Sequence, residues 1–336
     1  MWLEMTINDI AKMAGVSRMT VSRVLHGGYV SEAARARVEE VIGKTGYVPD
    51  VRAQALRSGS SKLVGILLPA LDSEVVRNIV EKLIEGMERN GYQSILLRYG
   101  GSIPRMLQQI QALKGRGVDG MILMIMTDTQ ELVQAATEFP APVVTIGPCA
   151  LPGVSGVVHN DEAAFRQMTE QVVEAGYQRI GTLFPGDSSS MTQLRRKSVE
   201  QVLKERGIPV CQEWMIQLDY ETLPHTEYGV PLGQQVLALR DRPQVFISAS
   251  DRIAFGVKQH LQANGIQVPQ ELAVTGAGNT ELAQLTQPPF PTIDMNIPQI
   301  VQLAQKYLLQ QMQAPKGERE MLRGCVEATV VWRGLS

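Results

Sequence analysis

The apolar positions of the first 46 residues repeat with the spacing of amphipathic helices. Four of them fall on one face of a first helix, namely Ile7, Ile10, Ala11 and Ala14. Gly15 follows and can turn the chain without a Cβ penalty. A second helix carries Val21, Val24 and Leu25 on its inner face, and a third carries Ala34, Val38 and Ile42. The pattern predicts three short helices around a small core.

From residue 62 onward the pattern changes to short, nearly continuous apolar runs that alternate with amphipathic helical stretches. The runs predict strands at 63–69, 92–98, 120–126, 141–147, 179–185, 244–249 and 272–277. Helices are predicted near 73–90, 102–116, 129–138, 161–176, 191–206, 252–264 and 296–312. This alternation is typical of parallel sheets covered on both faces, with ligands bound beyond the carboxyl ends of the strands. The number of strand and helix units suggests two sheets.

Polar residues mark where the amino-terminal helices begin. Thr6 and Asp9 form a capping-box pattern, in which the threonine oxygen accepts an amide hydrogen and the carboxylate reaches back. Ser17 and Ser31 are placed to cap the second and third helices, and Gly46 is placed to end the third. The first two helices and their turn therefore form a helix–turn–helix.

The outer face of the second helix carries side chains that can read DNA bases. An arginine can donate two hydrogen bonds to O6 and N7 of guanine, and a methionine can contact a thymine methyl group. Each good bidentate contact contributes about 1–3 kcal/mol of discrimination, so sequence choice is expected to rest on Arg18, Met19 and Arg23. The expected DNA contacts of this segment are Thr6, Ser17, Arg18, Met19, Thr20, Ser22, Arg23 and His26.

Length and charge divide the chain in the same way. With 336 residues and 44% hydrophobic content, it is long enough for a DNA reader and a larger body with a sizeable core. Residues 1–62 hold nine Lys and Arg against six Asp and Glu, whereas the whole chain has a net charge of −2. This asymmetry concentrates the attraction to phosphate at the amino end.

Other chemistry is sparse. Cys149, Cys211 and Cys325 are widely spaced and odd in number, so we expect reduced packing residues and no metal site. No cofactor is expected, and the chain lacks nucleophile motifs and phosphate loops, so we do not expect an enzyme. Without a signal peptide or a long apolar run, a cytoplasmic protein with no membrane partner is predicted. An enzyme or a sugar-binding protein on the same core is the alternative, because fold alone does not define function.

Three motifs resemble the lactose-repressor (LacI) family of bacterial transcription regulators. The chain reads T-x-x-D-I-A-x-x-A-G-V-S-x-x-T-V-S-R-V-L from Thr6, Y-V-P from Tyr47, and A-x-A-L-R-S-G from Ala53. In that family the last segment is a hinge helix whose paired leucines wedge into the minor groove and kink the duplex. The resemblance implies that Ala53 and Leu56 contact DNA. Asp50 departs from the family, which more often has asparagine there.

The resemblance implies an α/β protein with an amino-terminal helix–turn–helix DNA-binding domain and a periplasmic-binding-protein-like core of two doubly wound parallel-sheet lobes. We expect the headpiece at 1–48, the hinge helix and linker at 49–61, and the effector-binding and dimerisation core at 62–336. The lobes are expected at about 62–158 with 292–320 and at about 159–291 with 321–336. The effector is expected in the cleft between them.

Strand ends and family positions point to residues of this cleft. Asp72 and Ser73 leave the first strand of the core, and each is as suited to capping the next helix as to holding a ligand. Arg195 matches the family's effector-contacting arginine, whose guanidinium suits vicinal hydroxyls or a carboxylate. Asp251 matches the aspartate of the family's N-D-x-x-A-x-G motif, which accepts hydrogen bonds from sugar hydroxyls, with a plain helix cap as the alternative.

The chain departs from the family around the cleft. Residues 275–279 replace an aromatic residue and a carboxylate by small residues and Asn279, and Asn160-Asp161 stands where the family has an aspartate–asparagine pair. Loss of an anion there would make room for an acidic effector, because facing carboxylates repel each other in a low-dielectric site. We therefore expect Asn160 and Asn279 at the effector. Arg98 and Arg195 are candidate charge partners for a carboxylate, and either could equally be a surface or structural arginine.

Two groups of residues bear on the identity of the effector. The run S-R-M-T-V-S-R and the small residues at 277–278 resemble gluconate-operon repressors, whereas G-N-T at 278–280 resembles trehalose-operon repressors. Ala70 and Gly147-Pro148 stand where arginines would be expected for a sugar phosphate. A sugar or sugar acid, with gluconate favoured, is the expected effector, and trehalose or a phosphorylated sugar is the alternative.

Two-state linkage would connect the effector to the operator. A homodimer formed through the core would hold two heads at a fixed spacing, so palindromic double-stranded operator DNA is expected. The effector would act through its differential binding to two lobe arrangements, typically about 1–3 kcal/mol per site. Release of a repressor by an inducer is the commoner sense, and a corepressor would use the same parts. The sequence ends at Ser336 without a leucine heptad tail, which favours a dimer over a tetramer.

Overall fold

The computed structural model describes residues 5–25, 27–48, 59–186, 189–218, 228–315 and 317–335. The chain forms two compact units, Met1–Ser61 and Lys62–Ser336. Three of the expected DNA contacts, His26, Ala53 and Leu56, lie outside the described residues, and so does Asp50. Their roles stay predictions.

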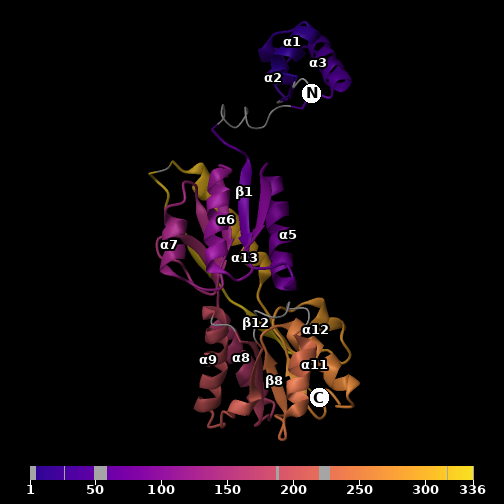
Figure 1. Ribbon diagram of the computed structural model, residues 1–336, viewed down its shortest axis with the longest axis vertical. Helices are drawn as coiled ribbons and strands as arrows, with labels where there is room; N and C mark the ends of the chain where they lie inside the picture. Colours follow the sequence, from indigo (N-terminus) through magenta and orange to yellow (C-terminus); the bar gives the residue numbers. More distant parts are fainter. Residues whose placement is uncertain are drawn as a thin grey trace. The chain divides into compact units, whose positions relative to one another are not determined.

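The first unit contains three helices, α1 (Ile7–Ala14), α2 (Arg18–Leu25) and α3 (Glu32–Thr45) (Figure 1). Its core consists of apolar residues at the predicted positions, namely Ile10, Ala11, Ala14, Val21, Val24 and Val38. Burial of one stripe from each helix stabilises elements that are too short to be stable in isolation.

The predicted helix caps of this unit are confirmed. The Thr6 amide donates to Asp9 Oδ2 over 2.9 Å, and the Asp9 amide donates to Thr6 Oγ1 over 3.4 Å. Ser17 Oγ accepts from the Thr20 amide at 3.1 Å. Both predicted glycine ends, Gly15 and Gly46, have a left-handed φ of 62° and 63°, a conformation that glycine adopts without a Cβ penalty.

The second unit contains a six-stranded parallel sheet in the order β11-β5-β4-β3-β1-β2. Its strands are β1 (Leu63–Leu68), β2 (Gln93–Arg98), β3 (Gly120–Met124), β4 (Val143–Gly147), β5 (Ser155–His159) and β11 (Arg323–Val326). The accompanying helices are α5 (Glu74–Arg89), α6 (Ile103–Gly115), α7 (Gln130–Thr137) and α13 (Ile297–Gln313) (Figure 1). The central strands are buried almost throughout, which explains their continuous apolar runs. This sheet and its helices form the amino-terminal lobe.

A separate four-stranded parallel sheet has the order β7-β6-β8-β9. Its strands are β6 (Ile180–Pro185), β7 (Met215–Leu218), β8 (Val245–Ser248) and β9 (Ala273–Thr275), and a 3-10 turn, Gln212–Trp214, precedes β7. Its helices are α8 (Asp161–Glu174), α9 (Ser190–Glu205), α10 (Gly229–Ala238), α11 (Asp251–Ala263) and α12 (Glu281–Leu285). These elements form the carboxyl-terminal lobe.

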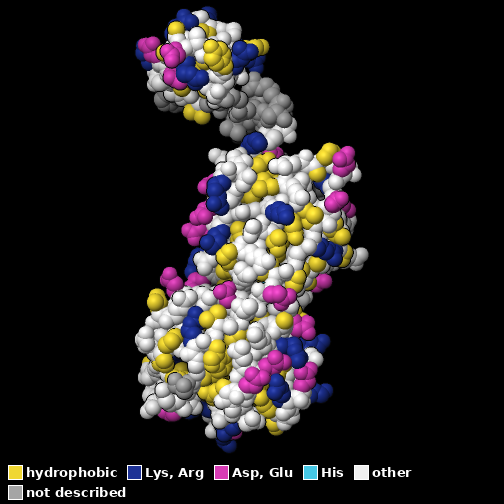
Figure 2. Space-filling view, turned by 180° about the vertical axis from the view of Figure 1, so that it is seen from behind, with side chains coloured by type: hydrophobic (Ala, Val, Ile, Leu, Met, Phe, Trp, Pro, Cys, Tyr) yellow, Lys and Arg dark blue, Asp and Glu magenta, His cyan; other side chains and the backbone are white. Residues whose placement is uncertain are grey.

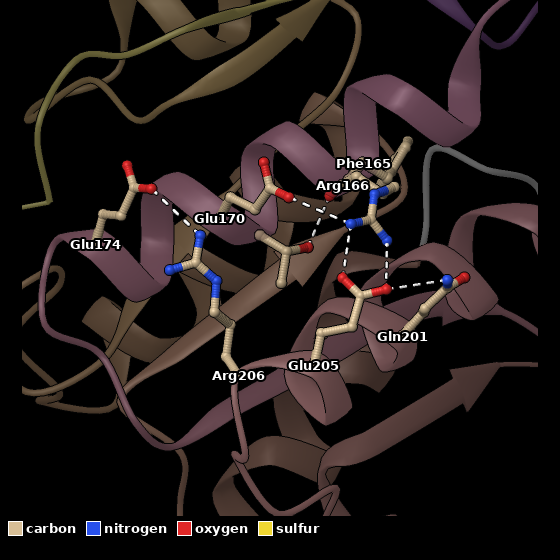
Figure 3. A network of polar contacts seen from close by, with 8 residues as sticks. Phe165, Arg166, Glu170, Glu174, Gln201, Glu205 and Arg206 are labelled. Atoms are coloured by element: carbon tan, nitrogen blue, oxygen red, sulfur yellow. Dashed lines mark hydrogen bonds and ion pairs between the residues drawn. The ribbon is translucent and has the colours of Figure 1, made fainter.

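Ion pairs tie α8 to α9 on the surface of this lobe (Figure 3). Arg166 donates to both carboxylate oxygens of Glu205, over 3.2 and 2.7 Å, and pairs with Glu170 on its own helix at 3.4 Å. Arg206 pairs with Glu174 at 3.5 Å. The bidentate geometry makes Arg166 and Glu205 a stronger pair than an ordinary surface contact.

Short strands connect the two lobes. β10 (Thr292–Asp294) pairs antiparallel with β12 (Thr329–Val331). The chain passes from β5 into α8, returns through β10 to α13, and leaves β11 for β12. The two ends of the core are thereby interwoven, so its two lobes are not contiguous segments of sequence.

All seven predicted strands and all seven predicted helices of the core are present, but one expected lobe boundary differs. We expected residues 321–336 in the carboxyl-terminal lobe, yet β11 pairs with β5, with Arg323 opposite Gly156, and so completes the amino-terminal sheet. The sequence pattern also missed short elements with weak periodicity: β5, β7, β10, β11, β12, α10 and α12.

The cysteines are free, and only part of their expected role is seen. Cys149 and Cys211 are half-buried, whereas Cys325 on β11 is exposed and is therefore not a packing residue. In the described part of the chain, no group of three or more His, Cys, Asp or Glu residues is placed to hold a metal ion. The described helices include none with the length and apolar character needed to cross a membrane.

Candidate DNA-reading and effector sites

Helix α2 exposes the side chains that the sequence assigns to DNA bases. Arg18, Met19 and Arg23 are exposed, Met19 to 63%, while the opposite face of the helix lies in the core. Within residues 5–25 and 27–48, neither of these two arginines forms an ion pair, so both guanidinium groups keep their donors for a ligand. Thr20 and Ser22 are half-buried beside them. The arrangement matches a helix that presents one polar face to the edges of bases.

Sequence reasoning missed an exposed aromatic residue next to this helix. Tyr29 is 93% exposed and follows the turn after α2. Arg35 on α3 donates through Nη2 to the Gly28 carbonyl over 3.1 Å, which fixes that turn against α3. On the face that Figure 2 shows, basic and hydrophobic side chains lie next to one another on this unit. The only sequence signal for Tyr29 was its position after the glycine pair Gly27-Gly28 and before the helix cap Ser31.

The core contains a cavity of about 170 Å³ between its two lobes. This volume is small beside the roughly 300–1,000 Å³ of pockets that hold drug-sized ligands. The loop after β1 and α5 line one side, and α9 and the start of α11 line the other. Four of the residues expected at the effector line it, namely Asp72, Ser73, Arg195 and Asp251. Ser73 also caps α5 by accepting from the Val76 amide at 3.5 Å.

Arg195 is already paired with a buried carboxylate. Its Nε donates to Asp161 Oδ2 over 2.5 Å, its Nη1 donates to the Ala249 carbonyl over 3.1 Å, and its guanidinium lies 5.1 Å from the centre of the Phe165 ring. His159 Nδ1 lies 2.5 Å from Asp161 Oδ1. Burial opposes ionisation of Asp161, but the charges of Arg195 and His159 hold the pKa of this carboxyl well below its usual range.

This pairing corrects one expectation. The change to Asn160-Asp161 was expected to remove an anion from the cleft and make room for an acidic effector. Instead, the Asp161 side chain is fully buried beside Arg195 and neutralises its charge. A ligand at the cavity therefore meets an arginine whose charge is already neutralised, together with His159, which also lines the cavity.

Asp251 lines the cavity but directs its carboxylate into the protein. Oδ2 accepts from the Thr280 amide at 2.7 Å and from Thr280 Oγ1 at 3.0 Å, and Oδ1 accepts from Thr292 Oγ1. Burial raises the pKa of Asp251 to about 6, although these hydrogen bonds favour the charged form. The helix cap is Ser250, whose Oγ accepts from the Ile253 amide at 3.3 Å. Asp251 thus joins α11 to the connections around β9 and β10.

The structure does not bring Arg98, Asn160 or Asn279 to the cavity. Arg98 is exposed at the end of β2. Asn160 caps α8 through its side-chain oxygen, 3.2 Å from the Ala163 amide, and donates to Glu327 over 3.0 Å. Asn279 has a φ of 46°, donates to Asp294 over 2.9 Å and accepts from Arg333 at 2.7 Å. Long-range contacts that are not visible in the sequence occupy both asparagines.

Much of the cavity wall is apolar, which the sequence did not indicate. The amino-terminal lobe contributes Val75, Val76, Ile79, Met124, Ile146 and Ile300. Met126, Met191 and Met295 add flexible thioether side chains. The polar groups not foreseen are Glu74, His159, Thr192, Ser250, Arg252 and Thr280. Residues from separate strands and helices meet here, so no local spacing identified them as one site.

A helix–turn–helix unit with an exposed basic face, followed by a two-lobed α/β unit around a cavity, defines a ligand-responsive DNA-binding regulator. Residues 6–50 match the family described as bacterial regulatory proteins, lacI family, and residues 169–334 match the periplasmic binding protein-like domain. The chain belongs to the lacI family of transcriptional regulators. The family, the fold class and the regulatory class expected from the sequence are confirmed.

Curated relatives match nearly the whole chain. The ribose operon repressor of Haemophilus influenzae is 28% identical over 330 residues, covering 98% of this chain and 97% of that protein. The HTH-type transcriptional repressor PurR of Photobacterium profundum is 27% identical over 320 residues, covering 94% of each. These relatives are repressors and not enzymes.

Solved structures share the fold. The lac repressor dimer bound to operator and the anti-inducer ONPF superposes with a TM-score of 0.84 at 23% identity, covering 99% of both chains. The complex of the transcriptional regulator CelR with cellobiose has a TM-score of 0.71 at 23% identity, covering 99% of this chain and 100% of that one.

Proposed function

We propose that this protein is an operon repressor that binds palindromic operator DNA as a homodimer and changes its operator affinity when a small carbohydrate enters the cavity. The exposure of Arg18, Met19 and Arg23 on one helix carries the DNA-binding part of the proposal. Relatives named as operon repressors, and the fold shared with an operator-bound dimer, support it. The hinge contacts and the cytoplasmic location stay predictions.

Operator reading is tested by selecting bound duplexes from a random pool with the full-length protein. We expect a palindromic consensus, because two heads of a dimer bind two related half-sites. Arg23→Ala should lose about 1–3 kcal/mol of discrimination at one position of each half-site. Arg37→Ala changes an exposed arginine of α3 and is the matched control, for which the consensus should be unchanged. An unchanged consensus with Arg23→Ala would refute the assignment.

Charge around the cavity supports an uncharged effector more than a sugar acid. Arg195 is matched by Asp161 at 2.5 Å, and Arg252 is matched by Glu74 at 2.7 Å. An added carboxylate or phosphate would have to compete with these protein carboxylates in a site of low dielectric constant. We therefore propose a neutral sugar in preference to gluconate or a sugar phosphate. The apolar wall suits the C–H face of a sugar ring, and Ser250 and His159 offer hydrogen-bonding groups.

The effector is tested by a thermal-shift screen of neutral sugars, including ribose and trehalose, against gluconate and sugar phosphates. A ligand at about 100 times its Kd adds about 2.7 kcal/mol to the folded state. A true cavity ligand should bind Ser250→Gly more weakly, because that hydroxyl lines the cavity. Ser102→Gly, which also removes a helix-capping serine but away from the cavity, is the control. A stabilising shift from gluconate alone would contradict the choice of a neutral ligand.

The sense of regulation needs one further measurement. Operator affinity with and without the sugar distinguishes an inducer, which weakens binding, from a corepressor, which strengthens it. We propose an inducer. The change in operator affinity should equal the change in sugar affinity caused by operator, because coupling between two binding sites is reciprocal.

A further inference from the structure

One ion pair joins the two lobes directly at the cavity. Arg252 Nη2, on α11 of the carboxyl-terminal lobe, lies 2.7 Å from Glu74 Oε1, on α5 of the amino-terminal lobe. Both residues line the cavity. We propose that Glu74 and Arg252 form a latch that holds the lobes together over the cavity and must loosen when the effector enters or leaves.

Helix electrostatics show that Arg252 is not placed to stabilise its own helix. It lies in the first turn of α11, where the aligned peptide dipoles disfavour a positive charge. Glu74 lies in the first turn of α5, where a negative charge is favourable. The two helix starts thus face each other with opposite side-chain charges. The local penalty on Arg252 is compensated by a partner on the other lobe.

Burial makes the pair more than a solvated surface contact. The side chains of Arg252 and Glu74 are 26% and 22% exposed. Arg252 Nε is buried and, among the described residues, has no hydrogen-bond partner. When the guanidinium of Arg252 is placed to bind Glu74, its Nε–H group is therefore left without an acceptor. Arg77, at 3.7 Å, is a looser second partner of Glu74 on the same helix.

Independent contacts join the lobes at other elements. The Met191 amide at the start of α9 donates to the Met126 carbonyl over 3.3 Å, and Ser190 Oγ lies 3.0 Å from Thr127 Oγ1. Figure 1 shows α7 and α9 along one side of the core and α5 and α11 along the other. Exchange of the Met191 amide therefore reports separation of the lobes at a place that the latch residues do not touch.

The test uses hydrogen–deuterium exchange of the full-length, ligand-free protein, resolved to single amides by mass spectrometry. We expect Glu74→Gln and Arg252→Gln each to speed exchange of the Met191 amide about 5- to 10-fold, in line with couplings measured for contacting residues. The double variant should show no more than the larger single effect. Exchanging the charges, with Glu74→Arg and Arg252→Glu combined, should slow exchange of the Met191 amide again.

Arg166→Gln is the matched control. Arg166 forms an ion pair of the same 2.7 Å length with a side chain 27% exposed, but its partner Glu205 lies in the same lobe (Figure 3). Exchange at Met191 should be unchanged in this variant. Arg252→Lys keeps the charge and should have a smaller effect than Arg252→Gln, which provides a second measurement if the glutamine variant folds poorly.

Unchanged Met191 exchange in both Glu74→Gln and Arg252→Gln would overturn the proposal. Additive effects in the double variant, or no rescue by the charge exchange, would also overturn it. The latch rests on the proposed function only where it treats the cavity as the effector site. The exchange measurement needs neither operator nor sugar, so its failure is distinguishable from failure of the proposed function.

Discussion

Replacing Arg195 by methionine should lower the free energy of unfolding of the carboxyl-terminal lobe, so its effect should not be limited to ligand binding. Asp161 is fully buried, and Arg195 is the cation 2.5 Å from it. Methionine preserves part of the aliphatic contact with Phe165 but leaves the carboxylate with His159 as its remaining partner. Removing one member of a buried ion pair typically costs about 3–5 kcal/mol. We expect about 3 kcal/mol, a large part of the roughly 5–15 kcal/mol that stabilises a typical protein.

The pH dependence identifies the cause of this loss. In the wild type the pKa of Asp161 is held low, so its stabilising contribution is present above about pH 4 and is lost as the pH falls. Without Arg195 the pKa of Asp161 should rise, because burial then dominates. Protonation at low pH removes the unpaired charge in the variant. The difference between the two proteins should therefore be largest near pH 7 and shrink towards pH 4.

Urea unfolding followed by the fluorescence of Trp214 is the assay. Trp214 is 8% exposed in the carboxyl-terminal lobe, and its indole donates to the Asp241 carbonyl over 2.9 Å. The other two tryptophans, Trp2 and Trp332, are replaced by phenylalanine in the background protein. Asp161→Asn combined with Arg195→Met should recover at least half of the loss, because the buried charge is then absent. A loss below about 1 kcal/mol, with no change between pH 7 and pH 4, would refute the reasoning.

Two further predictions concern packing and the second buried carboxylate. Gly256→Ala should lower the free energy of unfolding by about 1–3 kcal/mol in urea titrations, because the new Cβ would lie 2.6 Å from Gly229 Cα, where α10 and α11 pack together. The control is Gly115→Ala, which should be neutral or slightly stabilising because the space around Gly115 is open. Equal effects of the two substitutions would contradict the packing argument. The pKa of Asp251 is raised from 3.8 to about 6. The stability of the wild type should therefore fall relative to that of Asp251→Asn as the pH rises from about 4 to 6, by at most about 1.4 kcal/mol per pH unit. Parallel pH profiles of the two proteins in urea unfolding would contradict this prediction.

Local sequence determined the DNA-reading unit almost completely. Its caps depend on residues three positions apart, such as Thr6 and Asp9, and its core follows from helical periodicity. The exposure of Arg18 and Arg23 follows from the same period, because burial of Val21 and Val24 directs the other face of α2 outward. The strands of the core were equally visible, since burial on both faces requires continuous apolar runs.

The effector site was only partly predictable, because it depends on contacts between distant segments. Asp161 and Arg195 are 34 positions apart, and only the fold shows that the carboxylate neutralises the arginine. Asn279 was expected at the effector because residues 275–279 depart from the family pattern, yet its partners Asp294 and Arg333 hold it in a structural role.

Sequence by itself therefore determined the elements whose hydrogen bonds and burial are local: three capped helices, the alternating strands and helices, and a reading face. Tertiary structure alone decided that β11 joins β5, that methionines and isoleucines line the cavity, and that Glu74 meets Arg252 178 positions away. The physical reason is that the charge and hydrogen-bonding capacity of a side chain are defined only once its partners are known, and the partners of Arg195, Asp251 and Glu74 come from other elements, distant in the sequence.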